Sequence, residues 1–359
     1  MSELPVADPR AGFAAAREEL LQAFTEVLDS GSYILGEHVR AFERDWAEYC
    51  SCSRAVGLSS GTDALALALR AVGVGPSDEV LVPAMTAVAT WMAVAQIGAR
   101  PVGIDIERDR RAIDPALAAS AIGPRTRAIV AVHLFGQPAD MAALGSIASA
   151  AGIPLIEDAA QAHGARIGRQ RVGSIGAAAA FSFYPTKNLG ALGDAGAVTT
   201  SNDELAERVR QLREYGWRTR ADAEIDGVNA RLDELQAALL RVMLARLDEA
   251  TRRRSEIAGA YLDGLARVRE LELPGRVPDT ESAWHLFVVN HARRDALAAE
   301  LARQGVATAV HYRPVAALNS AFQADGWRAG DFPVAERHAE TALTLPLHPA
   351  MSDAEVEAV

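Results

Sequence analysis

Lysine occurs once in this sequence of 359 residues, at position 187, although lysines and arginines together number 36. Arginine stays protonated, whereas a buried lysine can lose its proton and attack a carbonyl carbon to form a Schiff base. Codon bias and chance survival on a loop would also explain a single lysine. Lys187 nevertheless lies between an apolar run and a glycine, within Phe181-Ser182-Phe183-Tyr184-Pro185-Thr186-Lys187-Asn188-Leu189-Gly190, so it is a candidate reactive amine.

A second polar segment, Ser59-Ser60-Gly61-Thr62-Asp63, follows an apolar run and precedes a helical pattern. The glycine lets the backbone approach an anion, and the N-terminus of a helix offers free N–H groups, so the segment could hold a phosphate. An ordinary Ser/Thr helix cap is the alternative. The segment lacks the Gly-Lys-Ser/Thr of a Walker loop and the Gly-x-Gly-x-x-Gly of a dinucleotide site.

Two acids, Glu157 and Asp158, come directly after another apolar run, where they could hold the cationic nitrogen of a cofactor or cap a helix. A fourth segment, residues 227–231, brings an amide and a guanidinium to the start of a long helix. A phosphate site, a carboxylate and a lysine are what pyridoxal 5′-phosphate requires. The residue types therefore favour this cofactor.

The elements that must position these groups alternate between short apolar runs and longer amphipathic ones, which predicts an α/β fold with a largely parallel sheet covered on both faces. Strands are expected at residues 55–58, 79–82, 100–104, 128–134, 153–156, 178–183 and 197–200. Helices are expected at 63–72, 86–97, 114–121 and 139–151. In such sheets ligands bind beyond the carboxyl ends of the strands, where the polar segments fall.

Helical spacing also covers residues 13–29 and runs from Leu232 toward residue 265. A strand at 285–289, a helix at 295–304 and a strand at 306–312 then predict a small α/β domain. We expect a large domain over residues 1–250, joined by the long helix to a smaller domain over residues 251–359.

Composition excludes several classes of function. The net charge of −11 argues against nucleic-acid binding, and no apolar run is long enough to span a membrane. No secretion signal opens the chain. Cys50 and Cys52 can form neither a disulfide framework nor a metal site of their own, so we expect no metal and a cytoplasmic protein.

The polar segments together resemble the DegT/StrS-type sugar aminotransferases, which have the fold-type-I architecture of pyridoxal-phosphate enzymes. The resemblance runs from about residue 36 to residue 349. It depends on four segments in the family's order, which are Ser60-Gly61-Thr62-Asp63-Ala64-Leu65, Glu157-Asp158-Ala159-Ala160-Gln161-Ala162-His163-Gly164, the lysine segment, and Asn229-x-Arg231-Leu232-Asp233.

This resemblance implies a role for individual residues. Lys187 carries the Schiff base and moves the proton, Asp158 pairs with the ring nitrogen, and Gln161 lies near the cofactor's 3′-oxygen. The phosphate is held by Gly61, Thr62 and Ser182. Asn229 reaches the phosphate of a neighbouring subunit, which implies a homodimer with its active sites at the interface. The positions that face the sugar substrate are His163, Tyr184, His311, Tyr312 and Arg231.

The implied reaction moves an amino group from L-glutamate to a keto group of a nucleotide-linked sugar. Residues 132–141 and 89–91 are most similar to the branch that aminates dTDP-linked 3-keto-6-deoxy sugars. Positive charge for the nucleotide is expected from Arg213, Arg218, Arg220 and Arg231, the first three of which could equally form a solvated helix face. The alternatives are a cyclitol aminotransferase and a non-catalytic protein that binds the cofactor. Ala87 departs from the family, because relatives usually place an aromatic ring there.

Overall fold

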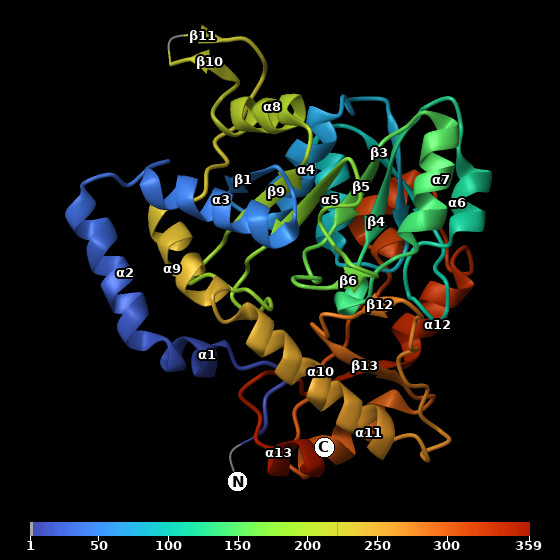
Figure 1. The fold of residues 1–359 in the computed structure, drawn as a ribbon. Coiled ribbons are helices and arrows are strands. Elements are labelled where there is room, and N and C mark those ends of the chain that lie inside the picture. The colour runs from blue at the N-terminus through green and yellow to red at the C-terminus, as the bar shows by residue number, and fades with distance from the viewer. Residues whose placement is uncertain (1–2, 221) are drawn as a thin grey trace.

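The computed structural model describes residues 3–220 and 222–359 and contains a seven-stranded sheet with the order β1-β9-β8-β5-β4-β2-β3 (Figure 1). Its strands are β1 (Arg54–Leu58), β2 (Glu79–Pro83), β3 (Arg100–Ile104), β4 (Thr126–Val132), β5 (Leu155–Asp158), β8 (Ala178–Ser182) and β9 (Gly196–Thr200). Strand β9 pairs antiparallel with β1 and β8, and all other pairs are parallel. These are the seven strands expected from the sequence, so the mostly parallel α/β fold is confirmed.

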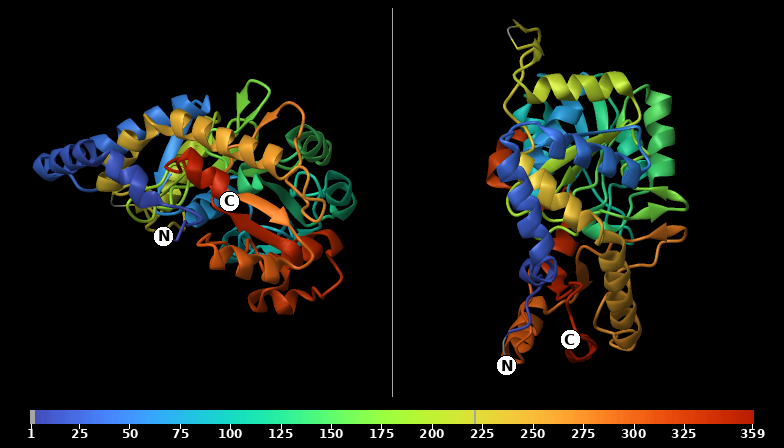
Figure 2. Two further views of the ribbon diagram at one scale, coloured as in Figure 1. Left: turned by 90° about the horizontal axis from the view of Figure 1, so that it is seen from below. Right: turned by 60° about the vertical axis from the view of Figure 1, so that its left-hand side comes forward.

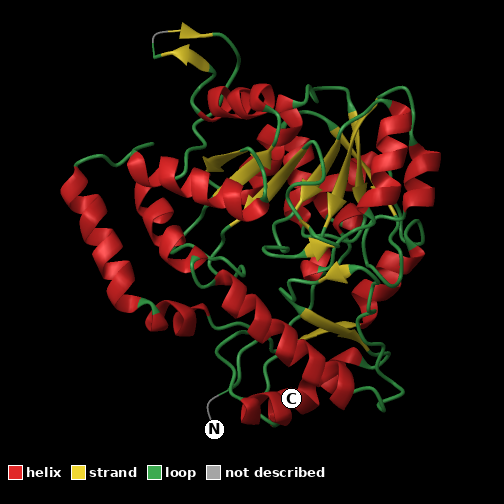
Figure 3. Ribbon diagram, viewed as in Figure 1, coloured by secondary structure: helices red, strands yellow, loops and turns green. Residues whose placement is uncertain are grey.

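Helices pack on both faces of this sheet (Figures 1 and 3). One face is covered by α4 (Gly61–Ala71), α5 (Val88–Gln96) and α8 (Asp203–Arg213). The other is covered by α3 (Glu37–Cys50), α6 (Pro115–Ala121), α7 (Met141–Ala151) and α9 (Glu234–Leu244). Both cores are rich in alanine, and the core beneath α4, α5 and α8 is also rich in valine, as expected for strands buried on both sides.

Two helical segments that the sequence predicts as continuous are each broken in two. The first consists of α1 (Pro9–Ala15) and α2 (Arg17–Ser30), and the second of α9 and α10 (Leu247–Gly264). Helix α2 packs on α9 through Leu20, Ala23 and Val27. A 3.6-residue pattern passes through such breaks without a change in its apolar face, so the pattern alone does not locate them.

The smaller domain contains an antiparallel pair, β13 (Phe287–Asn290) and β14 (Ala342–Leu345), with α11 (Arg294–Arg303), α12 (Pro333–Thr341) and α13 (Asp353–Ala358). The strand expected at 306–312 does not form; Val306 and Ala309 make isolated bridges there, with Leu4 and Thr344 respectively. Residues near the N-terminus join this domain, because Leu4 bonds to the backbone at 305 and 307, and Val6 accepts from Leu347. Figure 2 shows both termini in this part of the molecule.

Short elements complete the chain. They are the sheet of β6 (Arg166–Ile167), β7 (Gln170–Arg171) and β12 (Thr280–Glu281), the hairpin of β10 (Trp217–Thr219) and β11 (Asp222–Ala223), and the 3₁₀ turns at Leu134–Gly136, Ala316–Leu318 and Ser320–Asp325. The hairpin projects from the large domain beyond α8 (Figure 1). Among the described residues, none of the helices is both long and apolar enough to span a membrane.

Candidate active site

A cavity of about 260 Å³ lies at the carboxyl ends of the central strands. Its wall contains five of the residues expected to hold a cofactor and the expected catalytic lysine. The wall is formed by Ser60, Gly61, Thr62, Leu65, Thr86, Ala87, Ala89, Thr90, Val132, Asp158, Ala160, Gln161, Ser182, Tyr184, Lys187 and Asp194. The fold therefore brings together segments more than 100 residues apart in the sequence.

Lys187 follows β8 on a tight turn. Its backbone N–H donates to the carbonyl of Tyr184 at 2.8 Å, and a Cβ added to Gly190 would lie 2.5 Å from the carbonyl oxygen of Pro185. The next residue, Asn188, donates to the carbonyl of Ala283 at 2.7 Å and so ties the turn to the segment that follows β12. Burial lowers the pKa of Lys187 to about 8, against the opposing effect of the Asp158 charge. A lysine with this pKa is partly neutral near physiological pH and can act as a base or nucleophile.

Asp158 is the last residue of β5 and is almost fully buried. Its Oδ2 accepts from Thr90 Oγ1 at 2.8 Å, and its Oδ1 accepts from the backbone N–H of Ala160 at 3.2 Å. The Thr90 hydroxyl also lies 2.8 Å from that of Thr86. Sequence reasoning missed both threonines as site residues; Thr86 lies just before α5 and Thr90 in its first turn, and their spacing of four residues was the available signal. The carboxylate is held in one orientation and faces the cavity.

Gln161 is fixed at both ends of its amide. Its Oε1 accepts from the backbone N–H of Phe135 at 2.7 Å, and its Nε2 donates to the hydroxyl of Tyr312 at 2.8 Å. Burial raises the pKa of Tyr312 to about 12, so this phenol stays protonated. The contact joins the small domain to the cavity wall.

The N-terminus of α4 closes the cavity beside β8. Ser60 caps this helix by accepting from the backbone N–H of Asp63 at 3.1 Å. A Cβ added to Gly61 would lie 2.5 Å from Ser182 Cβ, so only glycine allows the helix end to approach the strand this closely. Free N–H groups, the hydroxyls of Thr62 and Ser182, and the helix dipole then meet in one place, which suits a phosphate group.

The cavity wall fits pyridoxal 5′-phosphate in its chemistry. Gly61, Thr62 and Ser182 would hold the phosphate, Asp158 the ring nitrogen and Lys187 the aldehyde carbon. The close approach at Gly61 and the carboxylate fixed opposite the lysine are both present in the protein alone. Ala87 and Ala89 also line the cavity, and Tyr184, which is half exposed, is its only aromatic lining residue among the described positions.

His163 is placed differently from the expectation that it faces the substrate. The ring is fully buried among Trp46, Phe181 and Phe183, with centroid separations of 5.5–5.9 Å, and it is not part of the cavity wall. Neither ring nitrogen has a hydrogen-bond partner within residues 3–220 and 222–359. Burial, together with the charge of Lys187, lowers its pKa to about 3 and keeps the ring neutral.

Of the other expected substrate residues, Tyr184 lines the cavity, whereas His311, Tyr312 and Arg231 lie outside its wall. The Nδ1 atom of His311 lies 2.7 Å from Thr344 Oγ1, and Tyr312 reaches the site through Gln161. Arg231 donates to the side chain of Asn229 at 2.9 Å, and neither residue lines the cavity.

The expected cluster of arginines is only partly available to a ligand. Arg213 is buried, donates to Glu43 at 2.6 Å and to the carbonyl of Gly57 at 2.7 Å, and so has a structural role. The expectation that it serves the nucleotide is therefore wrong. Arg218 pairs with Glu224 at 2.8 Å in the projecting hairpin.

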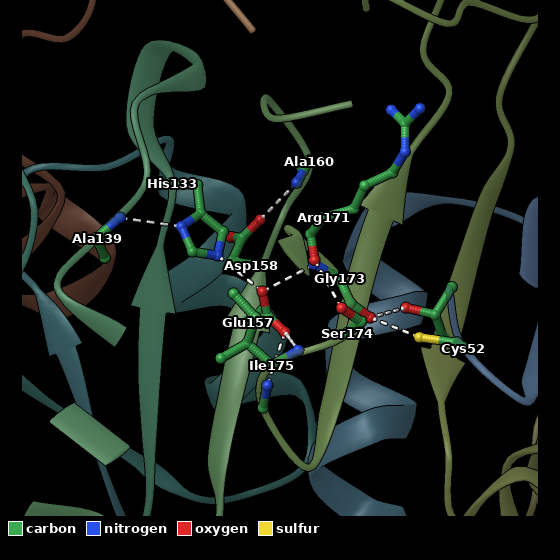
Figure 4. A network of polar contacts seen from close by, with 12 residues as sticks. Cys52, His133, Ala139, Glu157, Asp158, Ala160, Arg171, Gly173, Ser174 and Ile175 are labelled. Carbon is green, nitrogen blue, oxygen red and sulfur yellow. Dashed lines mark hydrogen bonds and ion pairs between the residues drawn. The ribbon is translucent and has the colours of Figure 1, made fainter. Parts of the chain in front are cut away.

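Glu157, beside Asp158, is the centre of a buried network (Figure 4). Its carboxylate lies 3.1 Å from His133 Nε2 and accepts from the backbone N–H groups of Gly173, Ile175 and Gly176, each at 2.8 Å. Because His133 Nδ1 accepts from a backbone N–H at 3.0 Å, the neutral ring carries its proton on Nε2 and donates it to Glu157. Burial raises the pKa of Glu157, but these hydrogen bonds outweigh it and hold the pKa below its ordinary value.

Comparison with known proteins agrees with this geometry. Residues 14–359 match the model of the DegT/DnrJ/EryC1/StrS aminotransferase family. The chain is 48% identical over 346 residues to the dTDP-3-amino-3,4,6-trideoxy-alpha-D-glucose transaminase of Streptomyces venezuelae, covering 96% of this chain and 91% of the relative.

Two solved structures are similar to this chain in both fold and sequence. The crystal structure of S. venezuelae DesV in complex with a ketimine intermediate superposes with a TM-score of 0.97 at 46% identity, covering 100% of this chain and 98% of the other. The PLP form of a putative sugar aminotransferase, Spr1654 of Streptococcus pneumoniae, has a TM-score of 0.91 at 28% identity, covering 99% and 96%.

Proposed function

Because the chain belongs to the DegT/DnrJ/EryC1/StrS aminotransferase family, we propose that it moves an amino group from L-glutamate to the keto carbon of a dTDP-linked 3-keto-6-deoxy sugar. It is an enzyme of the transaminase type, and its cofactor is pyridoxal 5′-phosphate. The relative that is 48% identical is named for a dTDP-linked sugar aminated at carbon 3, which supports this substrate. The product is an amino sugar for the biosynthesis of a natural product or a surface glycan.

The observation that carries the proposal is the placement of Lys187 and Asp158 in the wall of one cavity, beside the N-terminus of α4. The bound cofactor supplies an electrophilic carbon and a ring that accepts electrons. Asp158, whose carboxylate is fixed by Thr90 and Ala160, would keep a proton on the ring nitrogen. Lys187 Nζ would move the proton between the substrate carbon and C4′ of the cofactor, which its lowered pKa permits.

We also propose that the enzyme is a homodimer with its active sites at the interface. Helix α2 exposes Leu21, Phe24 and Leu28, which are 53%, 46% and 57% accessible and lie on one helical face. An exposed apolar stripe of this kind marks an interaction surface. Asn229 is exposed and lies outside its own cavity wall, as a residue that serves a partner's phosphate would. A dimer that persists in Leu21→Asp/Leu28→Asp protein, measured by light scattering, would contradict this interface.

Sugar-facing roles for Tyr184, His311, Tyr312, Arg231 and His163 belong to the same proposal. Tyr184 is the side chain best placed for such a role, because it lines the rim of the cavity and is half exposed. His163 requires a rearrangement of its aromatic neighbours before it reaches a ligand. We place the enzyme in the cytoplasm, where free thiols such as Cys50 and Cys52 are stable.

Absorbance spectroscopy followed by product analysis tests the proposed reaction. The purified enzyme should show the visible band of a lysine-bound cofactor, and L-glutamate should shift it to the amine form. Adding a dTDP-linked 3-keto-6-deoxy sugar should restore the visible band and give an aminated sugar by mass spectrometry. Amination of a keto-inositol without any nucleotide would instead favour a cyclitol substrate.

A further inference from the structure

A second and wider cavity, of about 810 Å³, meets the first at Lys187. Residues 7–15 and the lysine turn form two of its sides, and the start of α10 with residues 348–350 forms the others. This volume is ordinary for a small-molecule site. A ligand in the wider cavity would therefore reach the same amine that serves the cofactor.

The wall of the wider cavity is positively charged, although the chain as a whole carries a net charge of −11. Arginine and lysine side chains outnumber carboxylates in the wall. The basic residues are Lys187, Arg246, Arg252, Arg253 and Arg254, and the acidic ones are Asp8, Glu249 and Glu256. Arg246 pairs with Glu19 and Arg253 with Asp353, so these two are already neutralised.

Arg254 differs from them, because it is 5% exposed and forms no ion pair with any described residue. Its Nη1 donates to the carbonyls of Trp284, His285 and Leu347 at 3.2, 3.4 and 2.9 Å. Within the part of the chain that the structure describes, its Nε has no hydrogen-bond partner. A buried guanidinium without a counter-charge is costly, and a ligand anion would offset that cost.

His348 lies in the same wall and is 6% exposed. Both of its ring nitrogens lack partners among residues 3–220 and 222–359. Burial and the nearby Arg254 charge lower its pKa, so the ring is neutral and has one N–H to donate. The wall thus offers two unpartnered donors beside one cavity.

We propose that Arg254, assisted by His348, binds a carboxylate of the amino donor L-glutamate in the wider cavity. The proposal rests on the proposed function, in which a dicarboxylate enters first and a keto sugar second. A guanidinium binds a carboxylate through two parallel hydrogen bonds, and the Nε edge of Arg254 is the edge left free by the backbone carbonyls. The keto sugar brings no carboxylate, so this site would select the donor.

The test measures each half-reaction separately with the intact holoenzyme. Arg254→Gln should raise the L-glutamate and 2-oxoglutarate concentrations at half-saturation by about 30-fold or more, because it leaves a bound carboxylate unpaired. The half-reaction with the dTDP-linked keto sugar should stay unchanged. Arg254→Lys should give an intermediate effect, because it keeps the charge and loses the two-bond geometry.

Arg111 provides a matched control. It is 7% exposed, donates to the carbonyl of Val288 at 2.8 Å, forms no ion pair with a described residue, and lies outside the wider cavity. Burial lowers the pKa of both arginines to about 10. Arg111→Gln should reduce thermal stability as Arg254→Gln does, without a selective effect on glutamate.

Calorimetric titration of glutarate, a dicarboxylate that cannot react, gives a readout independent of turnover. Glutarate should bind the wild-type holoenzyme and the Arg111→Gln variant and fail to bind Arg254→Gln. Equal weakening of both half-reactions in Arg254→Gln, or a loss of dTDP binding with glutarate binding retained, would overturn the proposal. A wild-type enzyme that binds glutarate but aminates no keto sugar would instead refute the proposed function and leave the anion site standing.

Discussion

Glu157 and Asp158 are neighbours on β5, yet they have different roles, because successive side chains of a strand point to opposite faces of the sheet. Glu157 is fully buried and receives four hydrogen bonds, three from backbone N–H groups and one from His133. Asp158 receives two and faces the cavity. An acid whose acceptor sites are filled by the protein stabilises the fold, whereas one with unfilled sites can serve a ligand. The following predictions test this division.

Lys187→Arg should have the largest effect, because arginine keeps its proton and can neither form a Schiff base nor act as a base. We expect turnover to fall by at least about 10³-fold. Thermal unfolding monitored by circular dichroism should be close to wild type. Since Lys187 is the only lysine, borohydride reduction followed by peptide mass spectrometry should label this position in the wild type and not in the variant. Residual activity above a few per cent would contradict the catalytic role.

Asp158→Asn should reduce turnover by about 10²-fold, because a neutral amide does not hold the proton on the cofactor ring. The loss of stability should be small, since the amide oxygen still accepts from Thr90. Single-turnover absorbance measurements with L-glutamate would show the slower step directly. A variant that keeps its activity would assign the ring nitrogen to another group.

Glu157→Gln should show the reverse pattern. The substitution removes the charge that four donors surround, and hydrogen bonds to a charged group are worth about 1.5–3 kcal/mol, so we expect the unfolding free energy to fall by about 2–3 kcal/mol. Urea unfolding measures that cost. Activity per folded molecule should remain near wild type, and a large fall in kcat without a fall in stability would end the division between the two acids.

Lowering the pH should remove the contribution of Glu157 to the free energy of unfolding. Its folded-state pKa lies below the ordinary value of 4.5, so its contribution to stability is complete above about pH 4.5 and is lost as the pH falls through the folded-state pKa. The difference in unfolding free energy between wild type and Glu157→Gln should therefore shrink as the pH drops below 4.5. A constant difference down to pH 3 would show that packing, and not charge, is responsible.

Thr90→Val should give the smallest effect. It removes one of the two donors to Asp158 with little change in shape, and one hydrogen bond to a charged group is worth about 2 kcal/mol or less. We expect kcat to fall about tenfold, consistent with that value. Thr86→Val removes a hydroxyl that contacts Thr90 and not Asp158, so its steady-state kinetics should change less.

The sequence predicts the sheet and the segments that meet at the cavity, because both depend on local patterns. Seven apolar runs give the seven strands, and three of the four polar segments lie at or directly after the carboxyl end of a strand. The contact between Thr90 and Asp158 spans 68 residues, so no local pattern reveals it. The same limit applies to Arg213, whose partner Glu43 is 170 residues away, and to the pairing of Gln161 with Tyr312.

Other differences have physical reasons of their own. The pattern at residues 306–312 resembles a strand, but Val306 and Ala309 form separate bridges to two different segments, around Leu4 and Thr344, so no continuous pairing develops. His163 lies in a motif of site residues and still points into the aromatic core, which spacing alone does not show. Asp194 lines the cavity and carried no signal in the sequence beyond its glycine neighbours.

The backbone bonds of Leu4 and Val6 to residues 305, 307 and 347 have a consequence for how the chain is assembled. The first described residues therefore pair with a part of the chain that follows the whole seven-stranded sheet. During synthesis the seven-stranded sheet can fold before residues 4 and 6 form their backbone bonds, because residues 305, 307 and 347 are made later. The wider cavity, which residues 7–15 and 348–350 enclose, is therefore completed only when that late contact closes.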